Sequence, residues 1–554
     1  MEKSIWLLWL FVCCVVGTEA LQTDSRWIVD DWGKRVKLSC VNWPSHLEAG
    51  VAEGLSKRPV DAISKGIAGM GFNCVRFTWP LFLFTNDTLA ATTVRRSFTN
   101  LGLFESIAGF QTNNPAIIDL SLLDAYQAVV ASLAKNNVLI ILDNHISILG
   151  WCCSSFDENG FFGDKYFDPD QWLKGLTKVA TTFNDTKNVV GMSLRNELRG
   201  PRQNVNDWYK HMTRGAEAVH AANPNVIIIL SGLQFDSDLS FLAAKPVNLS
   251  FSNKLAFEMH WYGFSNGQVW KSGNLNQVCG EKMADIKKKV GFLLDEGYPL
   301  FMSEFGFDMR GTNVNDNRFL HCLMGWAAEF DIDWALWTLP GSYYIRQGVV
   351  GHDETYGVYN WNWCDIRNQT MLNKISALQY TFTGPGYEEA HPHKLLFHPM
   401  TGLCVQIKFF YFYPPQMVLG PCPKAQQWKY TPQQTLTVIG TYFCLQAGGL
   451  GNLATLGIFC NENDSKWEAI SNSKMHLSSK LQDGTTLCLD INSDNNIITN
   501  DCKCLATESK CNPASQWFKI IDSTRYKTHG KNYPKLKSIV KNITKKFLGG
   551  SMFL

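Results

Sequence analysis

Excess charge of one sign and long apolar runs are both scarce in this sequence. Its 51 Lys and Arg residues against 49 Asp and Glu residues leave a formal net charge of +2, so no basic excess is available to bind nucleic acid or an acidic membrane surface. Beyond the N-terminus no segment offers about 18 consecutive apolar residues, which predicts no membrane-spanning helix. Charged residues make up only 18% of the chain and hydrophobic residues 45%, which excludes a disordered protein.

The N-terminus has the three-part pattern of a secretory signal peptide. Lys3 precedes an apolar run over 5–17 that is too short to span a bilayer, and the small residues that follow predict cleavage near Ala20. Of 17 cysteines, 15 lie beyond this signal, which fits disulfides in an oxidising compartment and leaves one cysteine unpaired. We therefore expect a secreted glycoprotein, extracellular or in the cell wall, with sequons at Asn86, Asn184, Asn248, Asn368, Asn463 and Asn542.

From residue 35 to about 382, short β-branched apolar runs alternate with stretches of helical period. This alternation predicts repeated βα units and a parallel sheet. A doubly wound open sheet would need a glycine-rich phosphate turn after its first strand, and none follows it. Eight units therefore predict an α/β fold, the (β/α)8 TIM barrel. The expected strands are 36–41, 74–78, 138–143, 189–194, 226–230, 255–259, 299–303 and 334–338, and the expected helices include 120–135, 172–183, 207–222, 281–296 and 315–330.

After 383–386 the pattern changes to closely spaced cysteines, glycines and turn residues. Three repeats of about 40 residues are too few for a propeller and predict an all-β trefoil domain. The segment resembles the ricin-type (ricin B) lectin domain, whose repeats end in Gln-X-Trp, although only the first repeat keeps that Gln. The repeats carry the cysteine pairs Cys404/Cys422, Cys444/Cys460 and Cys488/Cys502, and they end at Trp428, Trp467 and Trp517.

The chain thus divides into four expected parts: a signal peptide over 1–20, a barrel domain over 21–385, a trefoil domain over 391–521 and a basic C-terminal tail over 522–554. Between 525 and 546 the tail has eight Lys or Arg residues and no acidic residue. Such a composition is typical of a solvated extension. The alternative is adhesion to acidic wall polymers or phospholipid.

Two glutamates stand at the ends of expected strands. Glu197 follows the run 189–194, and Glu304 follows 299–303, 107 residues later. This spacing places them on the fourth and seventh strands, at the rim where catalytic residues of barrels converge. Two carboxyls about 5 to 5.5 Å apart suit a retaining glycosidase. Either glutamate alone could be a surface charge, but the matching strand ends favour catalysis.

Other strand ends carry polar and aromatic residues, and together with the glutamates they resemble glycoside hydrolase family 5 of the cellulase clan over about 32–382. The resemblance implies that Glu197 is the acid/base and Glu304 the nucleophile. It implies that Arg76 and Tyr262 hydrogen-bond the nucleophile and keep it ionised. The remaining residues would bind substrate: Asn196 at the 2-hydroxyl, His145 and His260 around the attacked sugar, and Trp337 stacked beneath it.

Alternative roles exist for the rim residues. His145 and His260 could be core histidines, and Trp337 could be plain packing. No His-X-X-X-His or other tight ligand spacing accompanies the histidines, so we expect no metal, and hydrolysis needs no cofactor. Cys152 and Cys153, just beyond His145, are expected to be disulfide partners in a loop rather than nucleophiles.

The expected function is a secreted retaining glycoside hydrolase that cleaves β-linked glucan or mannan, an oligo- or polysaccharide substrate. Two alternatives remain within this site, a transglycosylase and a β-glucosidase on small glucosides. A third is a lectin-like protein with a weakly active barrel. Retention of two mutually repelling carboxylates argues against an idle barrel.

Sugar binding by the trefoil depends on the residue two positions after each first cysteine. These residues are Gln406, Gln446 and Asp490. Only Asp490 keeps the lectin family's carboxylate, which accepts two hydrogen bonds from adjacent sugar hydroxyls. The resemblance therefore implies at most one strong glycan site, in the third repeat, with Asn500 as a second contact. The alternative is that Asp490 caps a turn and the domain is a spacer.

Overall fold

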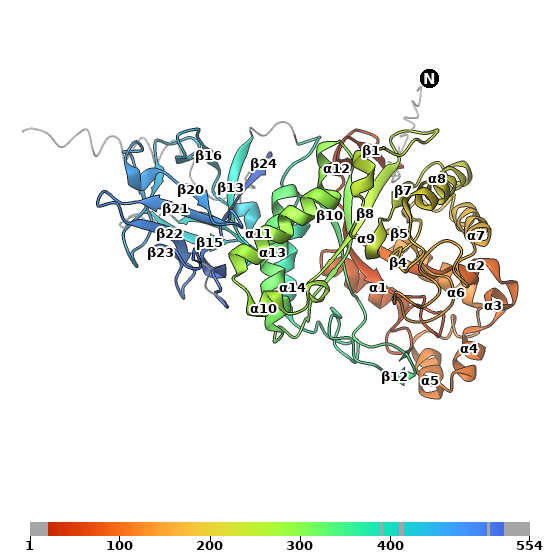
Figure 1. Ribbon diagram of the computed structural model, residues 1–554. Coiled ribbons are helices and arrows are strands. Elements are labelled where there is room, and N and C mark those ends of the chain that lie inside the picture. Colours follow the sequence, from red (N-terminus) through yellow and green to blue (C-terminus); the bar gives the residue numbers. More distant parts are fainter. Residues whose placement is uncertain (1–19, 388–391, 409–414, 507–509, 526–554) are drawn as a thin grey trace, which may run out of the picture.

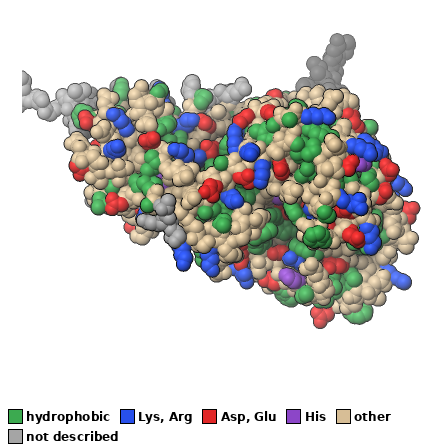
Figure 2. Space-filling view, in the orientation of Figure 1, with side chains coloured by type: hydrophobic (Ala, Val, Ile, Leu, Met, Phe, Trp, Pro, Cys, Tyr) green, Lys and Arg blue, Asp and Glu red, His purple; other side chains and the backbone are tan. Residues whose placement is uncertain are grey.

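The computed structural model describes residues 20–387, 392–408, 415–506 and 510–525, which form two domains side by side (Figure 1). The expected signal peptide and basic tail lie outside these residues except for their inner ends, as does Asn542. In the part of the chain that the structure describes, no helix is long and apolar enough to cross a membrane. On the face shown in Figure 2, basic and acidic side chains are interspersed over both domains.

Eight parallel strands close into a barrel in the order β10-β3-β4-β5-β6-β7-β8-β9. This confirms the predicted TIM barrel, and each strand overlaps an expected one. Several strands run beyond their expected ends because ladder pairs such as Tyr262 with Gly306 continue to the rim. The strands are β3 (Ser39–Trp43), β4 (Cys74–Pro80), β5 (Leu139–Ile146), β6 (Val189–Ser193), β7 (Ile227–Leu230), β8 (Leu255–Tyr262), β9 (Leu300–Gly306) and β10 (Asp333–Leu336).

Helices cover the outside of the barrel (Figure 1). The expected helix over 281–296 is divided, because a π-helical turn (Lys287–Gly291) separates α11 from α12 (Phe292–Asp295). Side-chain caps begin many helices; at the start of α7, Asp168 accepts backbone N–H bonds from Asp170 and Gln171. The longer helices are α1 (Val60–Gly69), α5 (Phe104–Asn113), α6 (Leu122–Lys135), α7 (Pro169–Thr182), α8 (Val205–Ala222), α11 (Leu275–Ile286) and α13 (Val314–Phe330).

Short elements fill the connections between these strands and helices. They are α2 (Leu81–Thr85), α3 (Asp87–Ala91), α4 (Val94–Asn100), α9 (Leu233–Asp236), α10 (Val269–Ser272), α14 (Gln369–Ile375) and the paired strands β1 (Gln22–Asp24) with β2 (Trp27–Val29) and β11 (Ile345–Arg346) with β12 (Val349–Val350).

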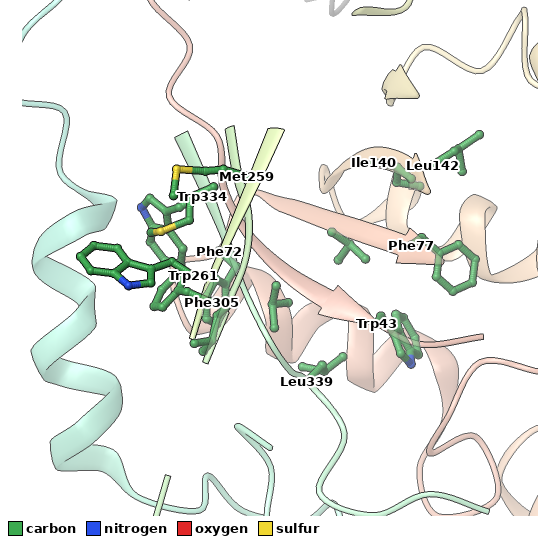
Figure 3. Packing of buried hydrophobic residues seen from close by; sticks show 14 of the residues in the cluster. Trp43, Phe72, Phe77, Ile140, Leu142, Met259, Trp261, Phe305, Trp334 and Leu339 are labelled. Carbon is green, nitrogen blue, oxygen red and sulfur yellow. The ribbon is translucent and has the colours of Figure 1, made fainter. Parts of the chain in front are cut away.

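The barrel has an inner and an outer core. Inside, small and aliphatic side chains pack around the Cys40–Cys74 disulfide, which joins β3 to β4. Outside, between strands and helices, lies a large hydrophobic cluster that includes fully buried Trp43, Phe77 and Trp334 (Figure 3). Burial of each such side chain contributes roughly 1.5–3 kcal/mol, so the strands that carry the rim residues are held firmly.

The C-terminal domain is all-β, as predicted. Its strands form an eight-stranded sheet and the four-stranded sheet β20-β21-β22-β23. The three expected cysteine pairs are disulfides, and the three Trp residues that end the repeats are fully buried. The strands are β13 (His393–His398), β14 (Leu403–Lys408), β15 (Gln416–Gly420), β16 (Trp428–Tyr430), β17 (Leu436–Val438), β18 (Cys444–Gln446), β19 (Thr455–Gly457), β20 (Glu468–Ile470), β21 (His476–Lys480), β22 (Thr486–Ile491), β23 (Ile497–Asp501) and β24 (Lys519–Ser523).

The two domains share a packed interface on α11 and α13. Buried Asn276 of α11 accepts hydrogen bonds from Trp517 Nε1 at 2.9 Å and Ser473 Oγ at 3.0 Å. Lys519 of β24 forms an ion pair of 2.7 Å with Glu329 of α13. The barrel's outer hydrophobic cluster also continues into this domain through side chains such as Trp517. The C-terminal domain is therefore docked on the barrel rather than tethered to it.

Candidate active site

Glu197 and Glu304 meet at one rim of the barrel. Glu197 follows β6 and Glu304 lies on β9, and one carboxylate oxygen of each lies within 4.8 Å of the other. Glu197 has a positive φ of 43°, which non-glycine residues rarely adopt outside functional turns. The rim placement that the sequence predicts for both residues is thus found in the structure.

Two side chains hold Glu304. Arg76 of β4, completely buried, donates from Nη1 to Glu304 Oε1 at 2.8 Å, and Tyr262 of β8 donates from Oη to Oε2 at 2.8 Å. Burial raises the pKa of Glu304 above its usual range, while His260, Arg76 and the Tyr262 hydrogen bond oppose that rise. These partners favour the ionised carboxylate that a nucleophile requires.

Glu197 has a different environment. Its Oε1 lies 3.0 Å from Nδ1 of His260, and Arg76 does not bond it directly. Burial raises the pKa of Glu197 to about 7, although Arg199 and Arg76 act in the opposite sense. A carboxyl with that pKa carries its proton at mildly acidic pH and can donate it.

Asn196 lies beside Arg76 and a pair of sulfur atoms. Its Oδ1 accepts from Arg76 Nη2 at 2.9 Å, and its Nδ2 lies 3.7 Å from Cys152 Sγ and 3.6 Å from Cys153 Sγ. Cys152 and Cys153 are disulfide partners, as expected, and they pair with each other. No local sequence pattern indicates that this vicinal disulfide lines the cleft beside Asn196, because that contact depends on how the loop after β5 folds back.

His145 and Trp337 form an aromatic stack beside the carboxylates. The His145 ring lies between His46 at 4.0 Å and Trp337 at 5.5 Å, both roughly parallel to it. Asp143 Oδ2 lies 2.7 Å from His145 Nδ1 and orients the ring. Burial and nearby Arg76 hold the pKa of His145 well below its usual range, so the ring is neutral at neutral pH. Sequence reasoning did not identify His46, which follows the first barrel strand.

A cleft of about 1070 Å³ surrounds these residues. Its lining includes Arg346, whose guanidinium carbon lies 3.3 Å from the centroid of the Trp151 ring and which pairs with Glu354. Exposed Phe264, which stacks on Tyr262 with the ring centroids 4.7 Å apart, and residues of α11 also line the cleft. Much of this lining comes from loops whose folded shape no local sequence pattern indicates. The volume leaves room for several sugar units.

Distance alone would allow a metal ion among Glu197, His260 and Glu304. The Arg76 guanidinium, however, already lies 2.8 Å from Glu304, and a fixed positive charge at that distance disfavours a cation.

In the C-terminal domain, Asp490 and Asn500 are brought together on β22 and β23. Asp490 is only 2% exposed, and its Oδ2 accepts hydrogen bonds of 3.1 Å from Asn500, Lys503 and Gln516. This carboxylate therefore organises the third repeat. Its role in glycan binding stays a prediction.

Comparison with known proteins identifies the family to which the barrel and its rim residues belong. The family model described as Cellulase (glycosyl hydrolase family 5) matches residues 45–342, more than half of the chain. The chain belongs to glycosyl hydrolase family 5. It is accordingly a glycosidase, and the resemblance drawn from the strand ends is confirmed for the barrel.

Relatives of this family 5 enzyme span both domains or the barrel alone. A glycosyl hydrolase 5 family protein of Chamaecyparis obtusa is 42% identical over 94% of this chain and 96% of its own length. The major extracellular endoglucanase of Xanthomonas campestris pv. campestris is 27% identical over 63% and 69%. The endocellulase of Pyrococcus horikoshii, in its complex with cellotetraose, has the same barrel fold, with a TM-score of 0.54, 18% identity, and coverage of 66% of this chain and 99% of its own.

Proposed function

We propose that this protein is a secreted, retaining family 5 glycosidase that hydrolyses β-linked glucan or mannan by double displacement. Glu304 attacks the anomeric carbon, and Glu197 first protonates the leaving oxygen and then activates water. The observation that carries the proposal is the proximity of the two carboxylates, whose nearest oxygens lie within 4.8 Å. An inverting enzyme needs about 6.5 to 9.5 Å to hold a water between its carboxyls.

The different environments of the two carboxyls assign their roles. Glu304 has a guanidinium and a phenol as direct donors, so it is the better stabilised anion. Glu197 has a pKa of about 7, and its carboxylate lies 3.0 Å from His260 with no guanidinium bonded to it among the described hydrogen bonds, so it is the better proton donor. Pairs of carboxyls with separated pKa values are how glycosidases divide these two tasks.

Asn196, His145, His260 and Trp337 form the proposed subsite of the attacked sugar. The Nδ2 group of Asn196 would donate to the 2-hydroxyl, a hydrogen bond that strengthens in the transition state. Trp337 is 7% exposed and lines the cleft, where its face offers an apolar platform to a sugar ring.

Covalent trapping tests the mechanism. A 2-deoxy-2-fluoro glycoside with a good leaving group should accumulate as an adduct on the peptide that contains Glu304, detected by mass spectrometry. With azide added, Glu304→Gly should form a glycosyl azide of inverted configuration, and Glu197→Ala one of retained configuration. An adduct on another residue, or exchanged configurations, would contradict the assignment. Glu281→Gln, an exposed carboxylate on α11, is the control.

A substrate panel tests the polymer class. Relatives named as endoglucanases and the cellotetraose complex of the Pyrococcus horikoshii enzyme support β-glucan, and the cleft of about 1070 Å³ has room for more than one sugar unit. We expect hydrolysis of soluble β-glucans or β-mannans to exceed that of aryl monoglycosides. Faster cleavage of monoglycosides would favour a β-glucosidase, and products longer than the substrate would favour transglycosylation.

Secretion is supported by seven disulfides among the described residues, with exposed Cys364 left unpaired as the odd count predicts. Such disulfides form in an oxidising compartment. The sequon residues Asn86, Asn184, Asn248 and Asn463 are exposed and accessible to glycosylation. Full-length expression in plant cells should give a medium-localised protein, cleaved near Ala20, whose mass falls on enzymatic deglycosylation. Retention inside the cell would overturn this part of the proposal.

For the C-terminal domain we propose the ricin-type trefoil. Three repeats support it, each with a disulfide that starts at its first cysteine and a fully buried Trp at its end; the third repeat has a further disulfide, Cys504–Cys511. Glycan-array binding by full-length Glu304→Gln, which cannot turn over substrate, tests a sugar-binding role. Loss of one binding class in the Glu304→Gln/Asp490→Asn double variant would assign it to the third repeat. The absence of binding outside the cleft would make the domain a spacer.

A further inference from the structure

A buried carboxyl lies behind the proposed acid/base and has no assigned role. Asp236, at the end of α9 after β7, is completely buried. Its Oδ2 accepts the backbone N–H of Glu197 at 3.1 Å and lies 3.4 Å from His260 Nε2. The other ring nitrogen of His260, Nδ1, lies 3.0 Å from Glu197 Oε1. Asp236 is therefore linked to Glu197 in two ways. It bonds the Glu197 main chain directly, and it reaches the Glu197 carboxylate indirectly through the His260 ring.

The backbone that carries Asp236 is strained toward this contact. Gln234, Phe235 and Asp236 have φ values of 54°, 58° and 57°, and none is glycine. Each such residue costs of order 1–3 kcal/mol and persists only where the surroundings determine it. With Glu197, whose φ is also positive, four strained residues lie at or next to the contacts that link Asp236, His260 and Glu197.

Within the group formed by Asp236, His260 and Glu197, two buried side-chain atoms lack a hydrogen-bond partner among the described residues. They are Nε2 of His260 and Oδ1 of Asp236, which belong to adjacent side chains. Buried polar atoms are nearly always satisfied. A proton on Oδ2 of Asp236, the oxygen that lies 3.4 Å from His260 Nε2, satisfies the ring nitrogen.

The surrounding charges favour that proton. The cluster around Asp236 holds Glu258 and His260 of β8, Glu304 of β9, Asp143 of β5 and Arg76 of β4. Arg76 lies 2.8 to 3.7 Å from Glu304, Asp143 and Glu258, but no Arg or Lys pairs with Asp236 among the described ion pairs. Burial, with Glu258 and Glu197 nearby, raises the pKa of Asp236 well above its usual range.

We propose that Asp236 is a positioning residue for acid catalysis, which holds His260 in the tautomer with its proton on Nδ1. This proposal rests on the proposed glycosidase mechanism. The neutral Asp236 carboxyl donates to His260 Nε2, so Nδ1–H faces Glu197. When Glu197 gives its proton to the leaving oxygen, the carboxylate that forms accepts the Nδ1–H bond. No proton leaves Asp236 or His260 in this step.

Because the two ring nitrogens of His260 face Asp236 and Glu197, the loss of Asp236 should have a specific effect on Glu197. Without its donor, the His260 ring is free to carry its proton on Nε2, and Nδ1 then accepts the proton of Glu197. That arrangement stabilises the protonated acid and weakens it as a donor. The alkaline limb of the pH profile, which also senses Arg199, Arg76, Asp143 and Asp157 around Glu197, should therefore move to higher pH while the acid-assisted step slows.

Kinetics on two aryl glycosides of one sugar test the proposal. With a poor leaving group, Asp236→Ala should lower kcat/KM about 10²-fold, within the range that a positioned proton donor supplies. With a dinitrophenyl leaving group, which needs no acid assistance, the loss should be under about threefold. Asp236→Asn accepts the Glu197 N–H only with its amide oxygen in the place of Oδ2, which also faces His260 Nε2, so it supplies no donor to the ring and should share the leaving-group-dependent loss and the shifted pH profile. Asp238→Ala, on the same turn but bonded to the Ser240 N–H, is the matched control.

Three results would overturn the proposal: equal losses on both substrates, an Asn variant with wild-type kinetics, which would show that position 236 accepts rather than donates, or an unshifted alkaline limb in Asp236→Ala. Thermal unfolding of each variant distinguishes a folding defect from a positioning defect. A folding defect lowers the rates on both substrates together. Comparison of wild type with Glu197→Ala on the same two substrates tests the proposed function separately. If Glu197→Ala slowed both substrates equally, the acid/base assignment itself would fail.

Discussion

Arg76 Nη1 donates to Glu304 Oε1 at 2.8 Å from a completely buried position inside the barrel. The guanidinium reaches this site because alternate residues of β4 point inward, Cys74 into the inner core and Arg76 to the rim. Its second amino group holds Asn196 at 2.9 Å. One side chain thus orients both the proposed nucleophile and the residue proposed to contact the substrate 2-hydroxyl.

Arg76→Lys should lower kcat/KM by at least about 10²-fold and also lower the Tm, because lysine leaves some of the buried partners of Arg76 unpaired. Lysine keeps the charge but not the planar fork that bonds Glu304 and Asn196 together, and loss of one preorganised contact of this kind costs about 10²–10³ in rate. Steady-state kinetics with calorimetry measure both effects. Activity close to wild type would show that charge alone suffices.

The pH dependence of kcat/KM should be bell-shaped. Glu197, with its pKa of about 7, must be protonated, so activity falls as pH rises through that value. Glu304, whose pKa is raised above 4.5 mainly by burial, must be ionised, so activity also falls toward acid. Glu197→Gln, assayed with a dinitrophenyl glycoside, should lose the alkaline limb and keep the acid limb. Survival of the alkaline limb would assign it to another group.

The vicinal disulfide should matter through Asn196. In the double variant Cys152→Ala/Cys153→Ala the amide loses the two sulfur contacts of 3.7 and 3.6 Å, and a displacement of about 1 Å can cost 10²-fold. We expect kcat/KM to fall by up to about 10²-fold on a glucoside and much less on its 2-deoxy analogue. Cys444→Ala/Cys460→Ala, which removes a disulfide of the other domain, is the control. Equal losses on both sugars would separate the disulfide from Asn196.

Docking of the two domains should depend on Asn276. Asn276→Ala leaves the Trp517 indole N–H and the Ser473 hydroxyl without their acceptor, and a buried unsatisfied group costs about 1–3 kcal/mol. Calorimetry should show a lower Tm or a single transition divided in two. Gln277→Ala, an exposed neighbour on the same helix, should leave the transition unchanged. An unaltered Asn276→Ala transition would show that apolar packing alone holds the interface.

Local sequence pattern alone predicted the barrel, its eight strands and the rim positions of Glu197 and Glu304, because strand periodicity and strand ends are read from neighbouring residues. The unpaired cysteine and the all-β second domain also followed from spacing. The helix expected over 281–296 was less regular than predicted, since a π-helical turn divides it while leaving its apolar period nearly intact.

Only the tertiary structure decided which distant groups touch. Asp236 reaches His260 and Glu197 through a strained turn, the Cys152–Cys153 disulfide comes to rest against Asn196, and Asn276 receives Trp517 from 241 residues away. Such contacts depend on loop conformation and on close packing between elements. Neither loop conformation nor close packing produces a periodic pattern of apolar residues in the sequence. The sequence therefore determined the scaffold, and the folded structure determined the environment of its carboxylates.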